Sequence, residues 1–276
     1  MVNAVVSGGT DGIGRALARH FLSTGNSVII VGRSPQKGAE FLQEAERAGA
    51  SDRARFIRAD LGLVSEQRRV AAEIAEIFPV VDRLVLTAQH FQGKRTVTAE
   101  GFEQTFALYY LSRYVLSHAL VPQLEKSANP VVLNVCGPGV PTGEIHWDDL
   151  QLEHGYKGLK AMMQGSRAND LLGVGFTRAH PGSRVRYVLY NPVFVATNFS
   201  GDYKAPVRLG ISVAKLLGAT VEKGIRPAVA LVEEPPAAPL SAFKKRKPVS
   251  LDHKAFDQNA ADRLRTVTEE LLAART

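Results

Sequence analysis

The chain has 276 residues, 45% of them apolar and 22% charged, a balance typical of globular proteins that excludes a disordered chain. No run of about 18 apolar residues occurs, so we expect no membrane span, and the first six residues predict a strand rather than a signal peptide. The net charge of +7 is spread along the chain, apart from a basic run at 244–247 that precedes Pro248 in a proline-rich stretch. Such a run is typical of a solvated loop, so no nucleic-acid partner is expected.

The single cysteine, Cys136, excludes a disulfide within the chain and favours a reducing, cytoplasmic location. One cysteine cannot make a zinc site, and the seven histidines show no metal-ligand spacing. We therefore expect no metal.

Apolar strand-like runs alternate with segments of helical periodicity along most of the sequence. Strands are predicted at residues 2–6, 27–31, 54–58, 83–88, 130–135 and 184–190, and helices at residues 15–23, 36–48, 65–77, 100–120 and 161–177.

This alternation predicts an α/β fold, a doubly wound parallel sheet of Rossmann type formed by a single domain. Beyond Asn198 the pattern loosens, and several prolines indicate a loop-rich stretch before a terminal helix at 256–272. We interpret residues 200–276 as a substrate-side segment and C-terminal extension of the same domain.

A glycine-rich loop joins the first strand to the first helix, with the sequence Ser7-Gly8-Gly9-Thr10-Asp11-Gly12-Ile13-Gly14. Glycines allow a tight turn and close approach to a pyrophosphate, and the helix N-terminus supplies free N–H groups. Because the spacing lies between a strand and a helix, it predicts dinucleotide binding.

The loop resembles the T-G-x-x-x-G-x-G fingerprint of the short-chain dehydrogenase/reductase family, with Ser7 in place of the threonine. Residues 101–108 resemble its retinol-dehydrogenase-like branch, and the likeness runs from about residue 2 to residue 199. The resemblance implies that Asp60 and Leu61 contact the adenine of the cofactor. It also implies that Ala88 is the one residue kept from the family's Asn-Asn-Ala-Gly segment. Pro192 and Thr197 match the segment at the nicotinamide amide, where Val193 replaces the usual glycine.

Arg33 follows the second predicted strand, where an acidic residue would bind the ribose hydroxyl of NAD. An arginine instead suits the 2′-phosphate of NADP. The predicted cofactor is therefore NADP(H).

The family's usual catalysts are Asn, Ser, Tyr and Lys, and the resemblance aligns other residues with all four. Tyr109 aligns with the asparagine, Gly137 with the serine, Met163 with the tyrosine and Arg167 with the lysine. Methionine cannot exchange a proton, whereas Arg167 can still donate hydrogen bonds to the cofactor ribose. Tyr109 is a candidate replacement for the lost acid.

A second alignment uses the literal Tyr-x-x-x-Lys pair of Tyr156 and Lys160. Gly155 and Gly158 disfavour a helix there, and the pair lies one heptad before the expected position. Both alignments stay open at this stage. His90, after the fourth strand, and Cys136 are weaker candidates for contact with a substrate.

These residues are compatible with four hypotheses about the function. The first is a biosynthetic NADPH-dependent enzyme that reduces an iminium ion or a conjugated alkene, whose products need no strong general acid. The others are a non-redox cyclase, isomerase or dehydratase, a non-catalytic dinucleotide sensor, and an ordinary carbonyl reductase that uses Tyr156 and Lys160. The expected partner is a small-molecule substrate, and a homo-oligomer is possible.

Overall fold

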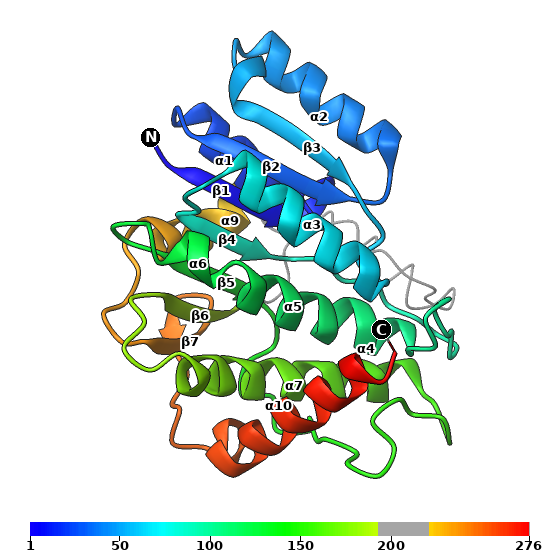
Figure 1. Cartoon of the computed structure of the whole chain (residues 1–276). Coiled ribbons are helices and arrows are strands. Elements are labelled where there is room, and N and C mark those ends of the chain that lie inside the picture. The colour runs from blue at the N-terminus through cyan, green and yellow to red at the C-terminus, as the bar shows by residue number, and fades with distance from the viewer. Residues whose placement is uncertain (193–220, 276) are drawn as a thin grey trace.

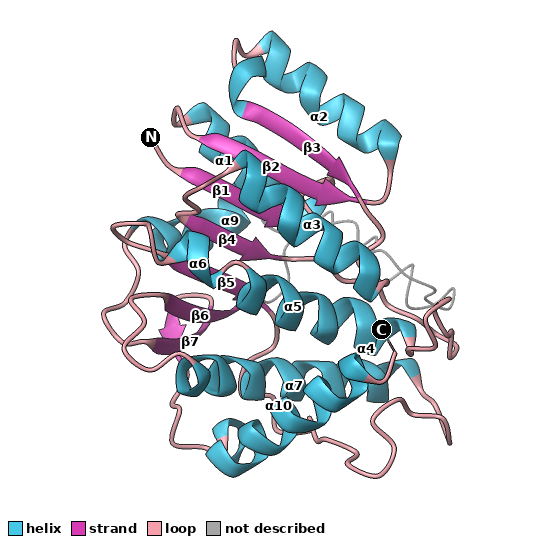
Figure 2. Ribbon diagram, in the orientation of Figure 1, coloured by secondary structure: helices cyan, strands magenta, loops and turns pink. Residues whose placement is uncertain are grey.

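The computed structural model describes residues 1–192 and 221–275. Its centre is an eight-stranded sheet in the order β3-β2-β1-β4-β5-β6-β7-β8. All neighbouring strands are parallel except β7 and β8. Helices cover both faces of the sheet (Figures 1 and 2). The predicted doubly wound α/β fold is confirmed.

The strands form where the sequence carries short apolar runs, and β1, β2, β4 and β5 are almost wholly buried, as expected for a sheet covered on both faces. Their bounds are β1 Asn3–Ser7, β2 Ser27–Gly32, β3 Ala54–Arg58, β4 Arg83–Leu86, β5 Val131–Val135, β6 Arg186–Asn191, β7 Leu240–Lys244 and β8 Lys247–Pro248.

Two apolar clusters divide the helices between the faces of the sheet. One cluster contains residues of α1, α2 and α9, and the other contains residues of α3, α5, α7 and α10. The longer helices are α1 Gly12–Ser23, α2 Pro35–Arg47, α3 Val64–Ile77, α5 Ser112–Ala119, α7 Gly158–Ala179, α9 Val221–Glu233 and α10 Gln258–Ala273. The short ones are α4 Gln104–Phe106, α6 Val121–Leu124, a π-helical turn Ala107–Leu111, and 3₁₀ turns Ser51–Arg53 and Lys254–Phe256.

The helix predicted over residues 100–120 begins later than expected. Glu103 is its N-cap, with carboxylate oxygens that accept from the N–H groups of Thr105 and Phe106. The helix then widens into the π-helical turn before continuing as α5. Such turns are frequent at functional sites.

The described C-terminal residues carry more regular structure than their prolines indicated. Helix α9 packs on the sheet, β7 extends it in parallel, and α10 lies along α7 (Figure 1). The predicted terminal helix is present, and the basic run lies at the exposed turn between β7 and β8.

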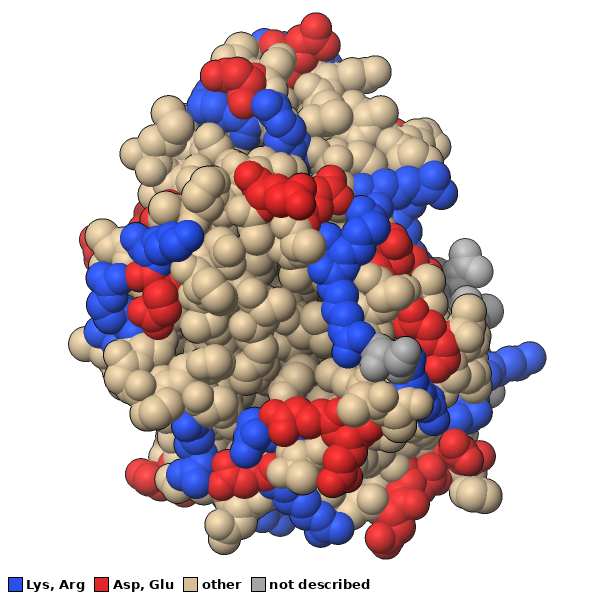
Figure 3. Space-filling model, viewed as in Figure 1, with Lys and Arg blue, Asp and Glu red and all other residues tan. Residues whose placement is uncertain are grey.

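Acidic and basic side chains are interspersed on the face shown in Figure 3, notably along α10. Arg178 of α7 pairs with Asp262 of α10 at 2.7 Å, and Arg265 pairs with Glu269 within α10 at 2.8 Å. Within residues 1–192 and 221–275, no helix combines the length and the apolar character needed to cross a bilayer.

Candidate active site

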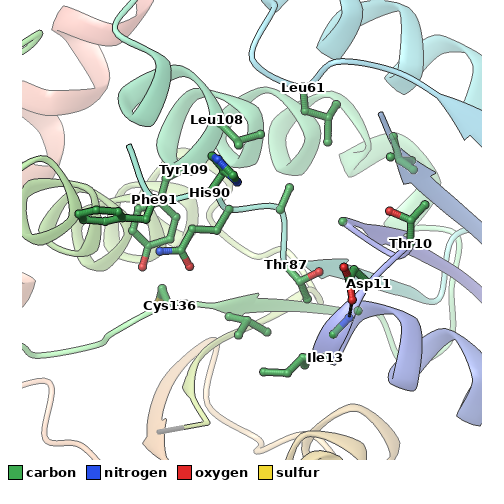
Figure 4. Close-up of a pocket in the computed structure, with 18 of the residues that line it drawn as sticks. Thr10, Asp11, Ile13, Leu61, Thr87, His90, Phe91, Leu108, Tyr109 and Cys136 are labelled. Carbon is green, nitrogen blue, oxygen red and sulfur yellow. Dashed lines mark hydrogen bonds between the residues drawn. The ribbon is translucent and has the colours of Figure 1, made fainter. Parts of the chain in front are cut away.

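A cavity of about 560 Å³ opens where the carboxyl ends of β1, β2, β4 and β5 meet. The glycine loop lines one end of it, while residues after β4, from the π-helical turn and from α7 line the other end (Figure 4). Crevices at this edge of a doubly wound sheet are the usual ligand sites of the fold. The volume is in the range of small-molecule and cofactor pockets.

The glycine loop forms a close-fitting cradle. Gly8 has a φ of +74°, and a Cβ there would lie 2.8 Å from the backbone nitrogen of Ala88. A Cβ on Gly14 would lie 2.4 Å from the carbonyl oxygen of Gly8. Gly8, Gly12, Ile13 and Gly14 all line the cavity, so the loop fits a ligand that needs close backbone approach.

Ser7 lies beneath this cradle rather than in it. Its side chain is fully buried, and within the described chain its hydroxyl has no hydrogen-bond partner. Its carbonyl oxygen accepts from the Thr87 hydroxyl at 2.6 Å, which ties the loop to the end of β4. Ser7 thus supports the loop from below.

Basic side chains line the end of the cavity beyond β2. Arg33 is exposed there, and Lys37 lines the same region while its ammonium group bonds to the carboxylate of Asp11. The other oxygen of Asp11 accepts from the Gly12 N–H at 2.7 Å and caps α1. A phosphate at this end would meet two cations.

The two residues predicted to contact the adenine, Asp60 and Leu61, occupy different environments in the structure. Leu61 lines the cavity, together with the neighbouring Ala59, but Asp60 does not. The Asp60 carboxylate accepts from the Gly62 N–H at 3.0 Å and holds the turn after β3. Ala88 also lines the cavity, and its contact with the cofactor stays a prediction. Thr197 lies outside the described residues.

Tyr109 lies at the opposite end of the cavity, on the π-helical turn (Figure 4). It is 3% exposed, and its hydroxyl lies 3.3 Å from the Ser166 hydroxyl on α7. Burial, with a smaller contribution from the nearby Cys136, raises the pKa of Tyr109 to about 12, although Arg113 acts in the opposite direction. The phenol therefore stays protonated near neutral pH and is available as a donor.

Gly165 of α7 makes room for this tyrosine. A Cβ on Gly165 would lie 2.4 Å from Cδ1 of the Tyr109 ring. Glycine inside a helix costs up to about 1 kcal/mol relative to alanine. Its presence here is explained by the aromatic ring that occupies the place of a side chain.

We therefore expect Gly165→Ala to lower the free energy of unfolding by about 1–3 kcal/mol through overpacking. Gly175→Ala, on the same helix, is the matched control, because its Cβ would meet only the Ala261 carbonyl oxygen at 3.7 Å. That change should be neutral or stabilising. Denaturant titration of both variants measures the difference.

A double-mutant cycle isolates the contact. In a Tyr109→Ala background, Gly165→Ala should cost no more than Gly175→Ala does in the unaltered chain. If Gly165→Ala alone is as benign as the control, the steric account of this glycine is wrong.

Two methionines of α7 also reach the cavity. The Sδ of Met162 accepts from Gln89 at 3.1 Å, and the Sδ of Met163 accepts from the Thr142 hydroxyl at 3.4 Å. This end of the pocket thus presents thioethers where the resemblance would place a phenol.

Arg167 does not line the cavity. It is 5% exposed, and its guanidinium donates to the carbonyl oxygens of Val140 and Gly143 at 2.9 Å each. It also lies 3.6 Å from the Asp170 carboxylate. The residue holds the loop after β5, and its contact with a cofactor ribose stays a prediction.

Tyr156 and Lys160 do not come together on one helix face, because α7 begins only at Gly158. The Tyr156 hydroxyl lies 3.2–3.3 Å from the Gln92 carbonyl, the Glu103 carboxylate and the Thr105 hydroxyl. Neither Tyr156 nor Lys160 lines the cavity.

Five residues of the site were not singled out from the sequence: Lys37, Arg113, Met162, Gly165 and Ser166. A glycine inside a predicted helix was the one visible signal. His90 and Cys136 both line the cavity, and burial raises the pKa of the Cys136 thiol above its usual range, so that thiol is a poor nucleophile.

Comparison with known proteins points to one family. The sequence profile described as short chain dehydrogenase matches residues 2–147. Oxidoreductase AN1596 of Emericella nidulans is 30% identical over 75% of this chain and 62% of its own length, so this chain spans about three-fifths of that relative. Retinol dehydrogenase 14 of Homo sapiens is 26% identical over 97% of this chain and 85% of its own length.

The fold comparison agrees. A short chain dehydrogenase from Burkholderia cenocepacia, solved in complex with NADP, superposes with a TM-score of 0.67 at 19% identity. The superposition covers 88% of this chain and 95% of that one. At such low identity the likeness concerns the fold.

Proposed function

Because the chain belongs to the short-chain dehydrogenase family, we propose that it is an NADP(H)-dependent reductase of conjugated alkenes. The observation that carries the proposal is the composition of the cavity wall, to which the buried phenol of Tyr109 and the thioethers of Met162 and Met163 all contribute. Such a wall suits an apolar unsaturated carbonyl compound whose reduction needs one modest proton donor.

The cradle and its basic end support the choice of cofactor. Gly8, Gly12, Ile13 and Gly14 would hold the pyrophosphate, and Arg33 with Lys37 would meet a 2′-phosphate. A bound NADPH would supply a hydride. Leu61 and Ala88 line the same cavity and would contact the nucleotide. The contact of Thr197 with the nicotinamide amide stays a prediction, because Thr197 lies outside the described residues.

Tyr109 would serve as the proton donor. Hydride addition to the β-carbon of an unsaturated carbonyl leaves an enolate, whose α-carbon must accept a proton. A phenol can protonate such a carbon, since the ketone C–H that forms is a far weaker acid than the phenol. The Ser166 hydroxyl, 3.3 Å from the Tyr109 oxygen, would orient that proton.

An iminium substrate fits the described pocket less well. A cationic substrate is stabilised by a nearby carboxylate. Of the described residues that line the cavity, only Asp11 is acidic, and it lies at the basic end, bonded to Lys37. We therefore favour the neutral conjugated alkene.

The test is a substrate panel followed by the loss of NADPH absorbance. Equal concentrations of an apolar enone, an apolar enal, a cyclic iminium salt and a saturated ketone are offered with NADPH and, separately, with NADH. We expect turnover with the enone or enal and NADPH, with reduction of the carbon–carbon double bond seen by NMR.

The remaining outcomes separate the alternatives. Preferred reduction of the saturated ketone would show an ordinary carbonyl reductase. Turnover without a change in nicotinamide absorbance would show a non-redox enzyme. Tight binding of NADPH without any turnover would favour a sensor.

A further inference from the structure

Arg113 is a fully buried cation without an ionic partner in the described part of the chain. Its exposure is 0%, and no carboxylate of residues 1–192 or 221–275 forms a salt bridge with it. Its guanidinium donates to the Asn134 side chain, to the Val135 carbonyl at 2.8 Å and to the Ala88 carbonyl at 3.3 Å. Its Nε atom has no acceptor in the same residues. Burying such a charge is costly, so its retention requires an explanation.

The position of the Arg113 guanidinium relative to the pocket explains why a buried charge is present. The guanidinium carbon lies 4.5 Å from the centre of the Tyr109 ring. Val135 and Ala88, whose carbonyls it binds, both line the cavity, so Arg113 also ties together the ends of β4 and β5 that form its floor.

We propose that Arg113 is the positioning residue for Tyr109, fixing its ring and stabilising the phenolate that remains after proton donation. The inference rests on the proposed function, in which Tyr109 is the donor. In that role Arg113, from the α5 helix that continues the π-helical turn, supplies a permanent positive charge beside a phenol.

The surrounding charges make this effect specific to Arg113. Apart from Arg113, Tyr109 is faced by Cys136 at the end of β5 and by Asp170 on α7, and both groups disfavour its ionised form. The charged or titratable neighbours of Arg113 are Tyr109, Cys136 and Tyr187 of β6. Arg113 is thus the cation that opposes the cost of ionising Tyr109, and it remains protonated at neutral pH although burial lowers its pKa.

The proton balance is closed. Tyr109 loses its proton to the α-carbon of the substrate, the negative charge remains on its oxygen beside Arg113, and solvent returns the proton after product release. A cation within about 4–6 Å lowers the pKa of an acid by about 1–3 units, which is the size of effect to be measured.

The test titrates the phenol directly and needs no substrate. 3,5-Difluorotyrosine, which ionises at lower pH than tyrosine, replaces Tyr109 in the full chain, and phenolate absorbance is recorded against pH. We expect Arg113→Met to raise the midpoint by about one unit or more. Arg113→Lys should keep it close to that of the unaltered chain. Equal shifts in both variants, or no shift in Arg113→Met, would overturn the proposal.

A second measurement leaves Arg113 intact, in case its removal prevents folding. Tyr110, the next residue of the π-helical turn, is also fully buried, but it bonds to the Thr268 hydroxyl at 2.8 Å, and no arginine of the described residues stacks on its ring. Difluorotyrosine at 109 should titrate at lower pH than at 110, and the reverse order would refute the role of Arg113. If these titrations behave as expected while no alkene is reduced, the proposed reaction is wrong but the role of Arg113 beside Tyr109 stands.

Discussion

Replacing Tyr109 by phenylalanine should slow reduction of a conjugated alkene by about 10²-fold or more, with KM little changed. The change removes a proton donor that acts in the transition state, and general acids contribute about 10²–10⁴-fold. The fold should survive, because within the described residues the only side-chain hydrogen bond that the change removes is that to Ser166 at 3.3 Å. A neutral hydrogen bond contributes about 0.5–1.5 kcal/mol to stability. Steady-state kinetics with NADPH measures the effect.

Tyr156→Phe is the matched control. Its hydroxyl also has buried partners, Glu103 and Thr105, but it does not line the cavity. We expect kcat to stay within about twofold of the unaltered enzyme. If Tyr156→Phe abolishes turnover and Tyr109→Phe does not, the second alignment is right and the enzyme is an ordinary carbonyl reductase.

Replacing Arg33 by alanine should weaken NADPH binding by about 10- to 100-fold while leaving NADH binding nearly unchanged. A charge-assisted hydrogen bond contributes about 1.5–3 kcal/mol, and each 1.4 kcal/mol corresponds to about a tenfold change in Kd. Arg33 lies at the exposed rim of the cavity beyond β2, and its change removes a bond that only the 2′-phosphate can accept. Calorimetric titration with each dinucleotide measures both affinities.

Arg47→Ala controls for the loss of one positive charge. Arg47 ends α2, about 18 Å along the helix axis from the end next to Arg33. The Arg47→Ala change should leave the affinities for NADPH and NADH unchanged at physiological salt, because exposed charges at that distance are screened. A parallel loss of NADPH and NADH binding in Arg33→Ala would show that Arg33 contacts a part common to both dinucleotides.

The glycine loop and the alternation of strands and helices were predictable from sequence because each depends on local chemistry. The loop glycines are required by backbone contacts within one turn, between Gly14 and Gly8 and between Gly8 and Ala88. Strand and helix periodicities differ, so element types follow from apolar spacing. Gly155 and Gly158 likewise indicated that Tyr156 precedes the helix, and α7 begins at Gly158.

Other features depend on neighbours that are distant in sequence. The strand β7 was not predicted, because the prolines around it indicated a loop. It forms because the edge of β6 provides a hydrogen-bonding partner. The late start of the helix after Glu103 reflects a cap whose carboxylate also meets Tyr156, more than 50 residues away. The bonds of the Arg167 guanidinium to the carbonyls of Val140 and Gly143 also join segments that are distant in sequence, while its contact with the cofactor stays a prediction.

By itself the sequence determined the family, the doubly wound sheet and the cradle for a dinucleotide, because these follow from residue types within short segments. Only the tertiary structure decided that Tyr109 fills the space left by Gly165 and lies over the buried charge of Arg113. The physical reason is that ring packing and burial of charge depend on distances between separate helices and strands, which no spacing along one segment specifies.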